Sequence, residues 1–348
     1  MNSKGDNIMR AAKIYGTKDI RVEETAIPPL EAGKVLVKVD YAGICGSDMH
    51  EYVAGTFPIR TQPVLGHEFS GTVVEVGEGV TTVEPGDQVA VEPLIACGHC
   101  SNCRRGMANL CSNSGGYGYS ISGGFAEYAV VKEENAFKLP AEMDVKLGAL
   151  VEPTAVAVHA VRQSTLRLGD TAAIFGAGPI GLLLLQAVKA AGASEIIVVE
   201  VSDDRREKAL ELGATHVLNP VEVDAVARIK ELTDGGVDVA FDAAGVQATF
   251  LSGVSAVRKG GEFKVVSLWE QPVTFSPNSF VKTEAKITGS YAYANLFPEV
   301  IRLLAGGIID GNKVITSLIP LGDIVEKGFE TLANDRKQCK ILVDMHLS

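Results

Sequence analysis

The sequence predicts an α/β protein with a β-rich part and a doubly wound parallel sheet. Three observations support this prediction. The chain has 348 residues, which is longer than a domain with a single hydrophobic core usually is, so two domains are expected. Near residue 153 the pattern changes from strand-like runs to strands that alternate with helices. The alternating part opens with a glycine-rich turn between a strand and a helix.

The part from about residue 10 to 139 has the pattern of β structure. Its β-branched residues cluster or alternate, and Gly and Pro punctuate the runs, as in strands joined by turns. The clearest predicted strands are Lys34–Asp40 and Ser70–Val76.

Between about residues 153 and 291, short apolar runs alternate with helical stretches, which predicts βαβ units on a parallel sheet. The predicted strands are Ala172–Phe175, Ile196–Val199, Val237–Phe241 and Lys264–Ser267. The predicted helices include Pro179–Ala191 and Arg205–Leu212. Further strand-like runs follow at Lys286–Ser290 and Lys340–Asp344.

Charge and hydropathy argue against two classes of partner. Thirty-two basic and 43 acidic residues give a net charge of −11, which opposes binding to nucleic acid or anionic membranes. Met1–Ile8 lacks the apolar stretch of a signal peptide. The uncharged run Ala172–Val188 is interrupted by three glycines and a proline, so we interpret it as strand, turn and helix. We therefore expect no membrane partner and a cytoplasmic location, where thiols stay reduced.

Four cysteines within fifteen residues predict a metal site. Zinc binds four thiolates tetrahedrally, and a complete thiolate shell leaves no position for water or substrate. A disulfide pair and an iron–sulfur cluster are the alternatives, but the chain has no second cluster and no proline after the last cysteine. The sequence therefore favours a structural zinc. Its predicted ligands are Cys97, Cys100, Cys103 and Cys111.

The glycine-rich turn predicts a dinucleotide site. Its glycines let the backbone approach a pyrophosphate, and the following helix begins at its positive end. An acidic residue at the end of the next strand, Glu200, can bind an adenosine ribose and repels a 2′-phosphate, which favours NAD over NADP. Arg205 lies close behind it and keeps NADP as an alternative. The predicted cofactor contacts are Gly176, Gly178, Pro179, Ile180, Gly181, Glu200 and Arg205.

Three further fragments hold metal-competent side chains: Cys45–His50, Gly66–Glu68 and Leu150–Pro153. Taken singly, each has an ordinary structural explanation. Cysteines are often buried in cores, and an acidic residue favours a helix N-terminus. Spacing alone does not join fragments that lie more than a hundred residues apart.

In their order along the chain, the Cys45–His50 motif, Gly66–Glu68, the cysteine cluster and the glycine-rich turn resemble the zinc-dependent medium-chain dehydrogenase/reductase family. The resemblance covers essentially the whole chain after Met9 and is strongest to the polyol and butanediol branch. It implies a GroES-like catalytic domain (residues 9–153 and 292–348) and a Rossmann NAD-binding domain (154–291). It also implies two zinc ions per chain and a homodimer or homotetramer.

The resemblance also implies the residues of a catalytic zinc site. Cys45 and His67 would bind the ion. Glu152 stands where many members have a cysteine, so it is the favoured third ligand, with Glu68 as the alternative. Ser47 would contact the substrate hydroxyl, and His50 would pass its proton to solvent.

For function, the resemblance implies reversible, NAD-linked oxidation of a secondary vicinal diol, 2,3-butanediol to acetoin, by hydride transfer. The small-molecule partner would be a diol or a hydroxyketone. A sorbitol or other polyol dehydrogenase is the alternative in the same branch, with Trp269 and Phe57 as candidate pocket walls. A non-enzymatic zinc- and NAD-binding relative is the alternative of another class. It predicts the loss of Cys45, His67 or His50, and all three are present.

Overall fold

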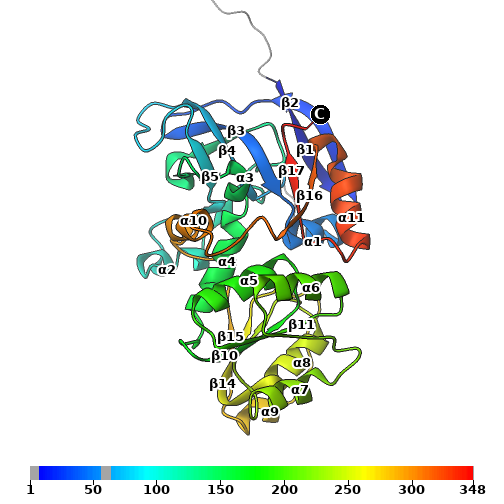
Figure 1. The fold of residues 1–348 in the computed structure, drawn as a ribbon. Helices are drawn as coiled ribbons and strands as arrows, with labels where there is room; N and C mark the ends of the chain where they lie inside the picture. The colour runs from blue at the N-terminus through cyan, green and yellow to red at the C-terminus, as the bar shows by residue number, and fades with distance from the viewer. Residues whose placement is uncertain (1–7, 56–63, 348) are drawn as a thin grey trace, which may run out of the picture. The chain divides into compact units, whose positions relative to one another are not determined.

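The computed structural model describes residues 8–55 and 64–347, so Phe57 and most of the N-terminal extension lie outside the described residues. The chain forms two compact units (Figure 1). Unit 1 comprises Met1–Glu152, Phe297–Ala305 and Ile315–Ser348, and unit 2 comprises Pro153–Leu296 and Gly306–Val314. Residues 306–314 belong to unit 2 because the Gln186 side chain accepts a hydrogen bond from Asp310 N at 2.6 Å.

Unit 1 is built on a seven-stranded sheet with the order β16-β17-β3-β4-β5-β9, in which β8 also pairs with β3. All pairings are antiparallel except that of β16 with β17. The strands are β3 (Lys34–Gly43), β4 (Glu68–Val76), β5 (Gln88–Val91), β8 (Tyr128–Lys132), β9 (Ala136–Lys138), β16 (Ile315–Ile319) and β17 (Lys340–Asp344). Two small sheets add β1 (Ile8–Gly16) with β2 (Asp19–Ala26) and β6 (Leu94–Ile95) with β7 (Gly115–Gly116).

The helices of unit 1 are short. They are α1 (Gly46–Ala54), α2 (Ser101–Arg104), α3 (Val145–Gly148), α10 (Phe297–Ala305) and α11 (Glu330–Asn334), together with α4 (Val151–Arg162), which continues into unit 2. Single turns of 3₁₀ or π helix occupy Ala108–Leu110, Glu133–Asn135, Leu321–Asp323 and Ile324–Phe329.

Strand β3 shows why this part of the sequence forms a sheet. Val35, Val37 and Val39 are fully buried, whereas Lys38 between them is exposed. Alternation of this kind puts every second side chain into the core. The valines join the large hydrophobic core of unit 1, which also contains Phe69, next to the candidate site on β4.

Unit 2 is an all-parallel six-stranded sheet with the order β12-β11-β10-β13-β14-β15. Counted from β10, this is the order 3-2-1-4-5-6 of a Rossmann fold, so the predicted fold class is confirmed. The strands are β10 (Thr171–Phe175), β11 (Glu195–Val199), β12 (His216–Leu218), β13 (Val237–Asp242), β14 (Val257–Val265) and β15 (Lys286–Gly289). The helices are α5 (Pro179–Ala190), α6 (Asp203–Leu212), α7 (Ala225–Leu232), α8 (Gln247–Ala256) and α9 (Asn278–Val281).

One predicted strand is displaced. The expected run Lys264–Ser267 overlaps only the end of β14, which begins at Val257. The apolar pattern did not mark this strand because two of its buried residues are charged. Glu262 and Lys264 are each 2% exposed and form an ion pair of 3.1 Å. Burial is tolerated because each charge has a partner, so apolar periodicity failed here.

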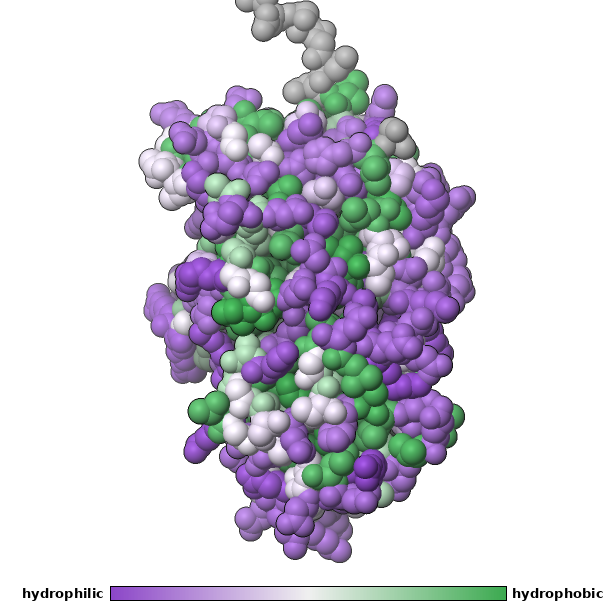
Figure 2. All heavy atoms as spheres, viewed as in Figure 1, coloured by the Kyte–Doolittle hydropathy of each residue, from purple (hydrophilic) through white to green (hydrophobic). Residues whose placement is uncertain are grey.

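Within residues 8–55 and 64–347, no helix is both long and apolar enough to cross a membrane. The apolar run Ala172–Val188 is divided between β10, the turn and α5, as predicted. On the face shown in Figure 2, hydrophilic residues cover most of the surface and hydrophobic residues form scattered patches.

Candidate functional site

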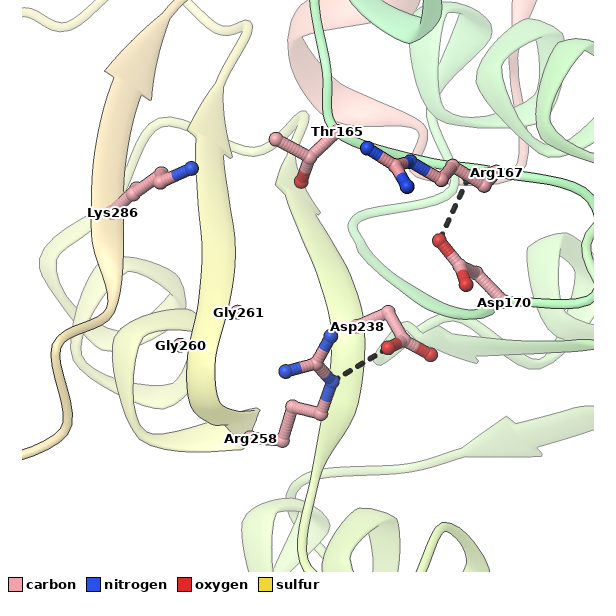
Figure 3. A pocket seen from close by; sticks show the side chains of 8 residues that line it. All are labelled: Thr165, Arg167, Asp170, Asp238, Arg258, Gly260, Gly261 and Lys286. Carbon is pink, nitrogen blue, oxygen red and sulfur yellow. Dashed lines mark hydrogen bonds and ion pairs between the residues drawn. The ribbon is translucent and has the colours of Figure 1, made fainter.

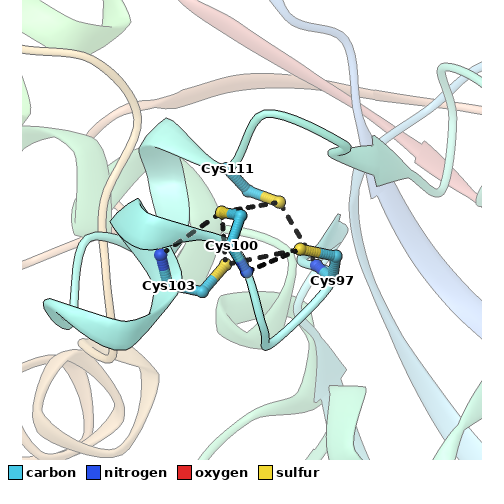
Figure 4. A group of neighbouring side chains, drawn as sticks. All are labelled: Cys97, Cys100, Cys103 and Cys111. Carbon is cyan, nitrogen blue, oxygen red and sulfur yellow. Dashed lines mark hydrogen bonds between the residues drawn. The ribbon is translucent and has the colours of Figure 1, made fainter.

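The four cysteines of unit 1 gather around one point, with all four sulfurs within 4.8 Å of one another (Figure 4). The Sγ of Cys100 lies 3.5 Å from that of Cys103 and 4.0 Å from that of Cys111. The Sγ atoms of Cys97 and Cys103 are also 4.0 Å apart. A tetrahedral zinc with Zn–S bonds of about 2.3 Å would separate its sulfurs by about 3.8 Å. The cluster therefore fits a zinc ion, and all six cysteines of the chain are free of disulfides.

Backbone N–H groups stabilise two of these thiols, Cys100 and Cys111, as thiolates. The N–H of Cys103, followed by that of Ser112, lowers the pKa of Cys100 to about 5. The N–H of Cys97 likewise lowers the pKa of Cys111. Burial, followed by the neighbouring Cys100, raises the pKa of Cys103 to about 12. A divalent cation is the group that balances several thiolates this close together, because each one opposes ionisation of the next.

A second group of donors lies at the start of β4, an interior strand of the main sheet of unit 1. One donor atom each from Cys45, His67 and Glu68 falls within 4.8 Å of the others. Cys45 caps the N-terminus of α1, and Glu68 begins β4. The side chains of His67 and Glu68 are 1% and 0% exposed. A thiolate, an imidazole and a carboxylate together form a donor set suited to zinc.

Asp48 orients both protein segments of this group. One of its carboxylate oxygens accepts a hydrogen bond from Cys45 N at 2.9 Å, and the other lies 3.5 Å from Nδ1 of His67. Burial lowers the pKa of His67, but the charges of Asp48 and Cys45 outweigh it and raise that pKa well above its usual value. This leaves Nε2 of His67 as the atom available to a metal, the arrangement typical of zinc-bound histidines.

Lys340 on β17 is the counter-charge of Glu68. Its buried Nζ donates to both carboxylate oxygens, at 2.6 and 2.8 Å, and to the carbonyl of Ile44 at 3.0 Å. Burial lowers the pKa of Lys340, but the charge of Glu68 outweighs it and the pKa is raised. No local pattern in the sequence marks Lys340 as a partner of Glu68, because 272 residues separate the two.

Two other predicted residues lie on α1, and a third lies on α4. Ser47 is in α1, with its Oγ 3.4 Å from Nε2 of His67, and the half-buried His50 lies one turn later. Glu152 is buried in the first turn of α4. Among the described residues, it is not part of the group of donors within 4.8 Å of one another.

Tyr119 is a site residue that sequence analysis missed. Its ring stacks on that of His67, with centroids 4.4 Å apart and planes 26° apart. Its side chain also forms a hydrogen bond with that of Ser47. Burial, followed by the negative charges of Glu152 and Cys45, holds the pKa of Tyr119 well above its usual value. The glycine-rich segment around it, Gly115–Gly124, was the available signal.

In unit 2 the predicted glycine-rich turn follows β10 and opens α5. Gly176 has a φ of +95°, which favours glycine. A Cβ at Gly181 would lie 1.9 Å from the carbonyl oxygen of Gly176, so only glycine permits this tight turn. Gly178 caps α5, whose first residues are Pro179 and Ile180. The turn thus presents a helix N-terminus with open backbone N–H groups, as a pyrophosphate site requires.

Glu200 lies directly beside this turn. Its carboxylate accepts hydrogen bonds from Ala177 N at 2.7 Å and Ser202 N at 2.9 Å. Arg206 is turned to the backbone, donating to the carbonyl of Glu200 at 2.8 Å. Arg205 is the nearest neighbour of Gly178, with Nη1 3.9 Å from the place of an added Cβ. The structure therefore brings an acidic side chain and an arginine together beside the glycine-rich turn.

A separate pocket of about 350 Å³ lies at the end of the unit 2 sheet that is opposite to the glycine-rich turn (Figure 3). Arg258 forms an ion pair with Asp238 at 2.6 Å, and the Asp170 carboxylate accepts a hydrogen bond from the backbone N–H of Arg167 at 2.8 Å. The pocket is formed at the amino ends of the strands. Ligands of such sheets bind at the carboxyl ends, where the glycine-rich turn lies, so we place no cofactor in it.

Comparison with known proteins shows the family of the chain. Residues 31–141 match the family model "Alcohol dehydrogenase GroES-like domain", and residues 179–306 match "Zinc-binding dehydrogenase". The chain is 46% identical to (R,R)-butanediol dehydrogenase of Bacillus subtilis, over 96% of this chain and 99% of that protein. It is 37% identical to sorbitol dehydrogenase of the same organism, over 92% and 94% of the two chains.

Solved structures give the same picture. The crystal structure of 2R,3R-butanediol dehydrogenase from Bacillus subtilis matches with a TM-score of 0.91 and 44% identity, over 97% of this chain and 99% of that one. A putative zinc-binding dehydrogenase from Sinorhizobium meliloti, bound to NADP, matches with a TM-score of 0.92 and 34% identity over the same shares. Zinc and a nicotinamide cofactor are thus features of proteins closely similar to this chain.

Proposed function

Because the chain belongs to the zinc-dependent medium-chain alcohol dehydrogenase family, we propose that it oxidises a secondary vicinal diol, 2,3-butanediol, to acetoin reversibly. The observation that carries the proposal is the convergence of Cys45, His67 and Glu68 within 4.8 Å, with the Ser47 hydroxyl beside them. This arrangement can hold a metal and a substrate oxygen side by side. The 46% identity to a butanediol dehydrogenase supports the diol as substrate.

We assign two zinc ions to each chain. Cys97, Cys100, Cys103 and Cys111 would hold a structural ion, because four thiolates complete its shell. Cys45, His67 and Glu152 would hold the catalytic ion, with Glu68 as an exchangeable ligand. Glu152 is favoured because both oxygens of Glu68 are already engaged by Lys340. Zinc at this position would act as a Lewis acid, which makes a bound alcohol more acidic and a bound ketone more electrophilic.

Ser47 and His50 would then transfer the proton of the substrate hydroxyl. Ser47 would accept the proton of the substrate hydroxyl, and His50 would pass it to solvent, with a ribose hydroxyl of the cofactor between them. The carbon would lose a hydride to the nicotinamide, so two electrons and one proton go to NAD and one proton goes to water. In the reverse direction, Ser47 would return a proton to the ketone oxygen.

NAD is the proposed cofactor, bound at Gly176–Gly181. The Glu200 carboxylate lies at the turn, held by two backbone N–H groups, so it would accept hydrogen bonds from the adenosine ribose and repel a 2′-phosphate. Arg205 keeps NADP as the alternative. We also propose the domain division 9–153 with 292–348 and 154–291, a cytoplasmic location, and a homodimer or homotetramer in which the edge strand β15 pairs with its copy.

Steady-state kinetics would test the diol assignment. We expect the highest kcat/KM for one 2,3-butanediol isomer and for acetoin in reverse, with NAD preferred to NADP. Sorbitol is the control substrate, because a relative that is 37% identical is a sorbitol dehydrogenase. Higher kcat/KM for sorbitol would replace the proposed function with that of a polyol dehydrogenase.

Metal analysis would separate an enzyme from a non-enzymatic relative. We expect about two zinc ions per chain in the purified protein. Glu152→Gln should lower the zinc content toward one, whereas Glu68→Gln should leave it closer to two. The opposite result would make Glu68 the third ligand. A single ion per chain in the unmodified protein, without turnover of any alcohol, would contradict the enzymatic assignment.

A further inference from the structure

The segment Gly115–Gly124 is fixed against the backbone that carries His67. Gly124 N donates to the carbonyl of Gly66 at 2.7 Å, and Gly123 N donates to that of Val64 at 2.9 Å. A Cβ at Gly123 would lie 2.1 Å from the Gly66 oxygen, and a Cβ at Gly118 would lie 2.7 Å from Gly66. Glycines are therefore required for this close approach.

The segment is also closed on itself. Gly118 N donates to the carbonyl of Ile121 at 2.7 Å, and Gly116 N donates to Oγ of Ser120 at 3.0 Å. These bonds hold the turn that carries Tyr119. The position of Tyr119 is thus set by backbone contacts within the turn and to the segment that leads into β4.

The ring and the hydroxyl of Tyr119 have different surroundings. Its ring stacks on His67 at 4.4 Å, and its hydroxyl is hydrogen-bonded to that of Ser47, the predicted contact of the substrate hydroxyl. The residue as a whole remains 41% exposed. A phenol both donates and accepts hydrogen bonds and has a further lone pair after the bond with Ser47. It can therefore serve a second polar atom next to the one at Ser47.

We propose that Tyr119 determines specificity for substrates with two neighbouring oxygens, by hydrogen-bonding the oxygen on the carbon next to the reacting one. The inference rests on the proposed function and deepens it. Ser47 contacts the reacting hydroxyl, and Tyr119, one hydrogen bond away from Ser47, contacts its neighbour in a diol or a hydroxyketone. A secondary alcohol with one oxygen leaves Tyr119 without this contact. Tyr119 thereby separates diols from simple alcohols.

Tyr119→Phe tests the proposal, because it keeps the ring against His67 and removes only the hydroxyl. A neutral hydrogen bond contributes about 1 kcal/mol, so kcat/KM for 2,3-butanediol should fall about fivefold. The value for 2-butanol, which lacks the second oxygen, should change less than about twofold by the same reasoning. Acetoin should bind the variant in the presence of NAD about fivefold more weakly by calorimetry, while the zinc content stays unchanged.

Tyr117→Phe is the matched control. Tyr117 belongs to the same segment, is 3% exposed, and its hydroxyl accepts from Lys132 N at 2.8 Å, away from the metal group. It should leave the ratio of the two kcat/KM values unchanged. An equal loss for butanediol and 2-butanol in Tyr119→Phe, or a loss of zinc, would overturn the inference and give Tyr119 a structural role. If the unmodified enzyme does not oxidise butanediol, the proposed function fails first, and the inference fails with it.

Discussion

The two candidate metal sites of unit 1 are built in opposite ways. The four-cysteine cluster takes all its ligands from one fifteen-residue segment, and they are of a single chemical type. The second site combines Cys45 with His67 and Glu68, more than twenty residues away along the chain, and is completed by Lys340 from the last strand. The first site is autonomous and closed, whereas the second depends on the sheet and has mixed donors. A catalytic metal site needs an open coordination position and tuned charges, and the second group would supply them with donors from distant parts of the chain.

The largest effect is expected at the second site. Cys45→Ser should lower kcat/KM for butanediol by about 10³-fold or more. The substitution weakens the binding of the metal ion that would supply several kcal/mol of transition-state stabilisation. Zinc should fall from about two ions to one, and the circular dichroism spectrum should stay unchanged. Cys103→Ser should do the reverse, lowering the melting temperature more than the activity of the remaining folded enzyme. Full activity in Cys45→Ser would refute the site assignment.

Removing the counter-charge of Glu68 should have the next largest effect, on the stability of unit 1 and on zinc binding. Lys340→Met leaves a buried carboxylate alone, which costs about 3–5 kcal/mol of folding free energy. Calorimetric melting would show the lower stability of unit 1. A zinc titration would show the altered zinc affinity. Lys264→Met is a matched control, because Lys264 is an equally buried lysine paired with Glu262 in unit 2. It should destabilise the protein without changing zinc binding. Equal zinc affinity in the two variants would show that Lys340 has no role at the metal.

A smaller change is expected when the orientation of His67 is weakened. Asp48→Asn removes the charge beside Nδ1 of His67, 3.5 Å away, and should weaken zinc binding at this site about 10- to 100-fold. Competition with a chelator would measure it, and the four-cysteine site of the same molecule provides the internal reference. Asp40→Asn, another buried carboxylate of unit 1, should leave both zinc affinities unchanged. Loss of zinc from the cysteine cluster in Asp48→Asn would contradict the independence of the two sites.

The smallest effect is expected in unit 2. Glu200→Gln keeps the carbonyl acceptor for Ala177 N but removes the charge, so the preference for NAD over NADP should fall about tenfold. The measurement is kcat/KM for each cofactor at saturating butanediol. Glu195→Gln, at the other end of β11, should leave the preference unchanged. An unchanged preference in Glu200→Gln would assign cofactor choice to Arg205 instead.

The sequence by itself determined whatever is local. The strand and helix around Gly176–Gly181 and the strand Lys340–Asp344 lie where periodicity and turn residues placed them, and the cysteine spacing brought four sulfurs together. These features depend on neighbours within about one turn or one strand, which the sequence displays directly. Strand β14 was misplaced where it buries the Glu262–Lys264 pair, because paired charges do not appear as an apolar run.

Only the tertiary structure decided how the second site is completed. Lys340 reaches Glu68 because β17 pairs with β3 and β3 pairs with β4, and Tyr119 reaches His67 because a glycine-rich segment packs on Gly66. Neither side chain has a spacing or a pattern that marks it in the sequence. Long-range pairing follows from the burial of whole strands, so a residue's partner across the sheet is set by the register of other residues. The resemblance to a family could name the metal ligands, but the charges and contacts around them had to be read from the fold.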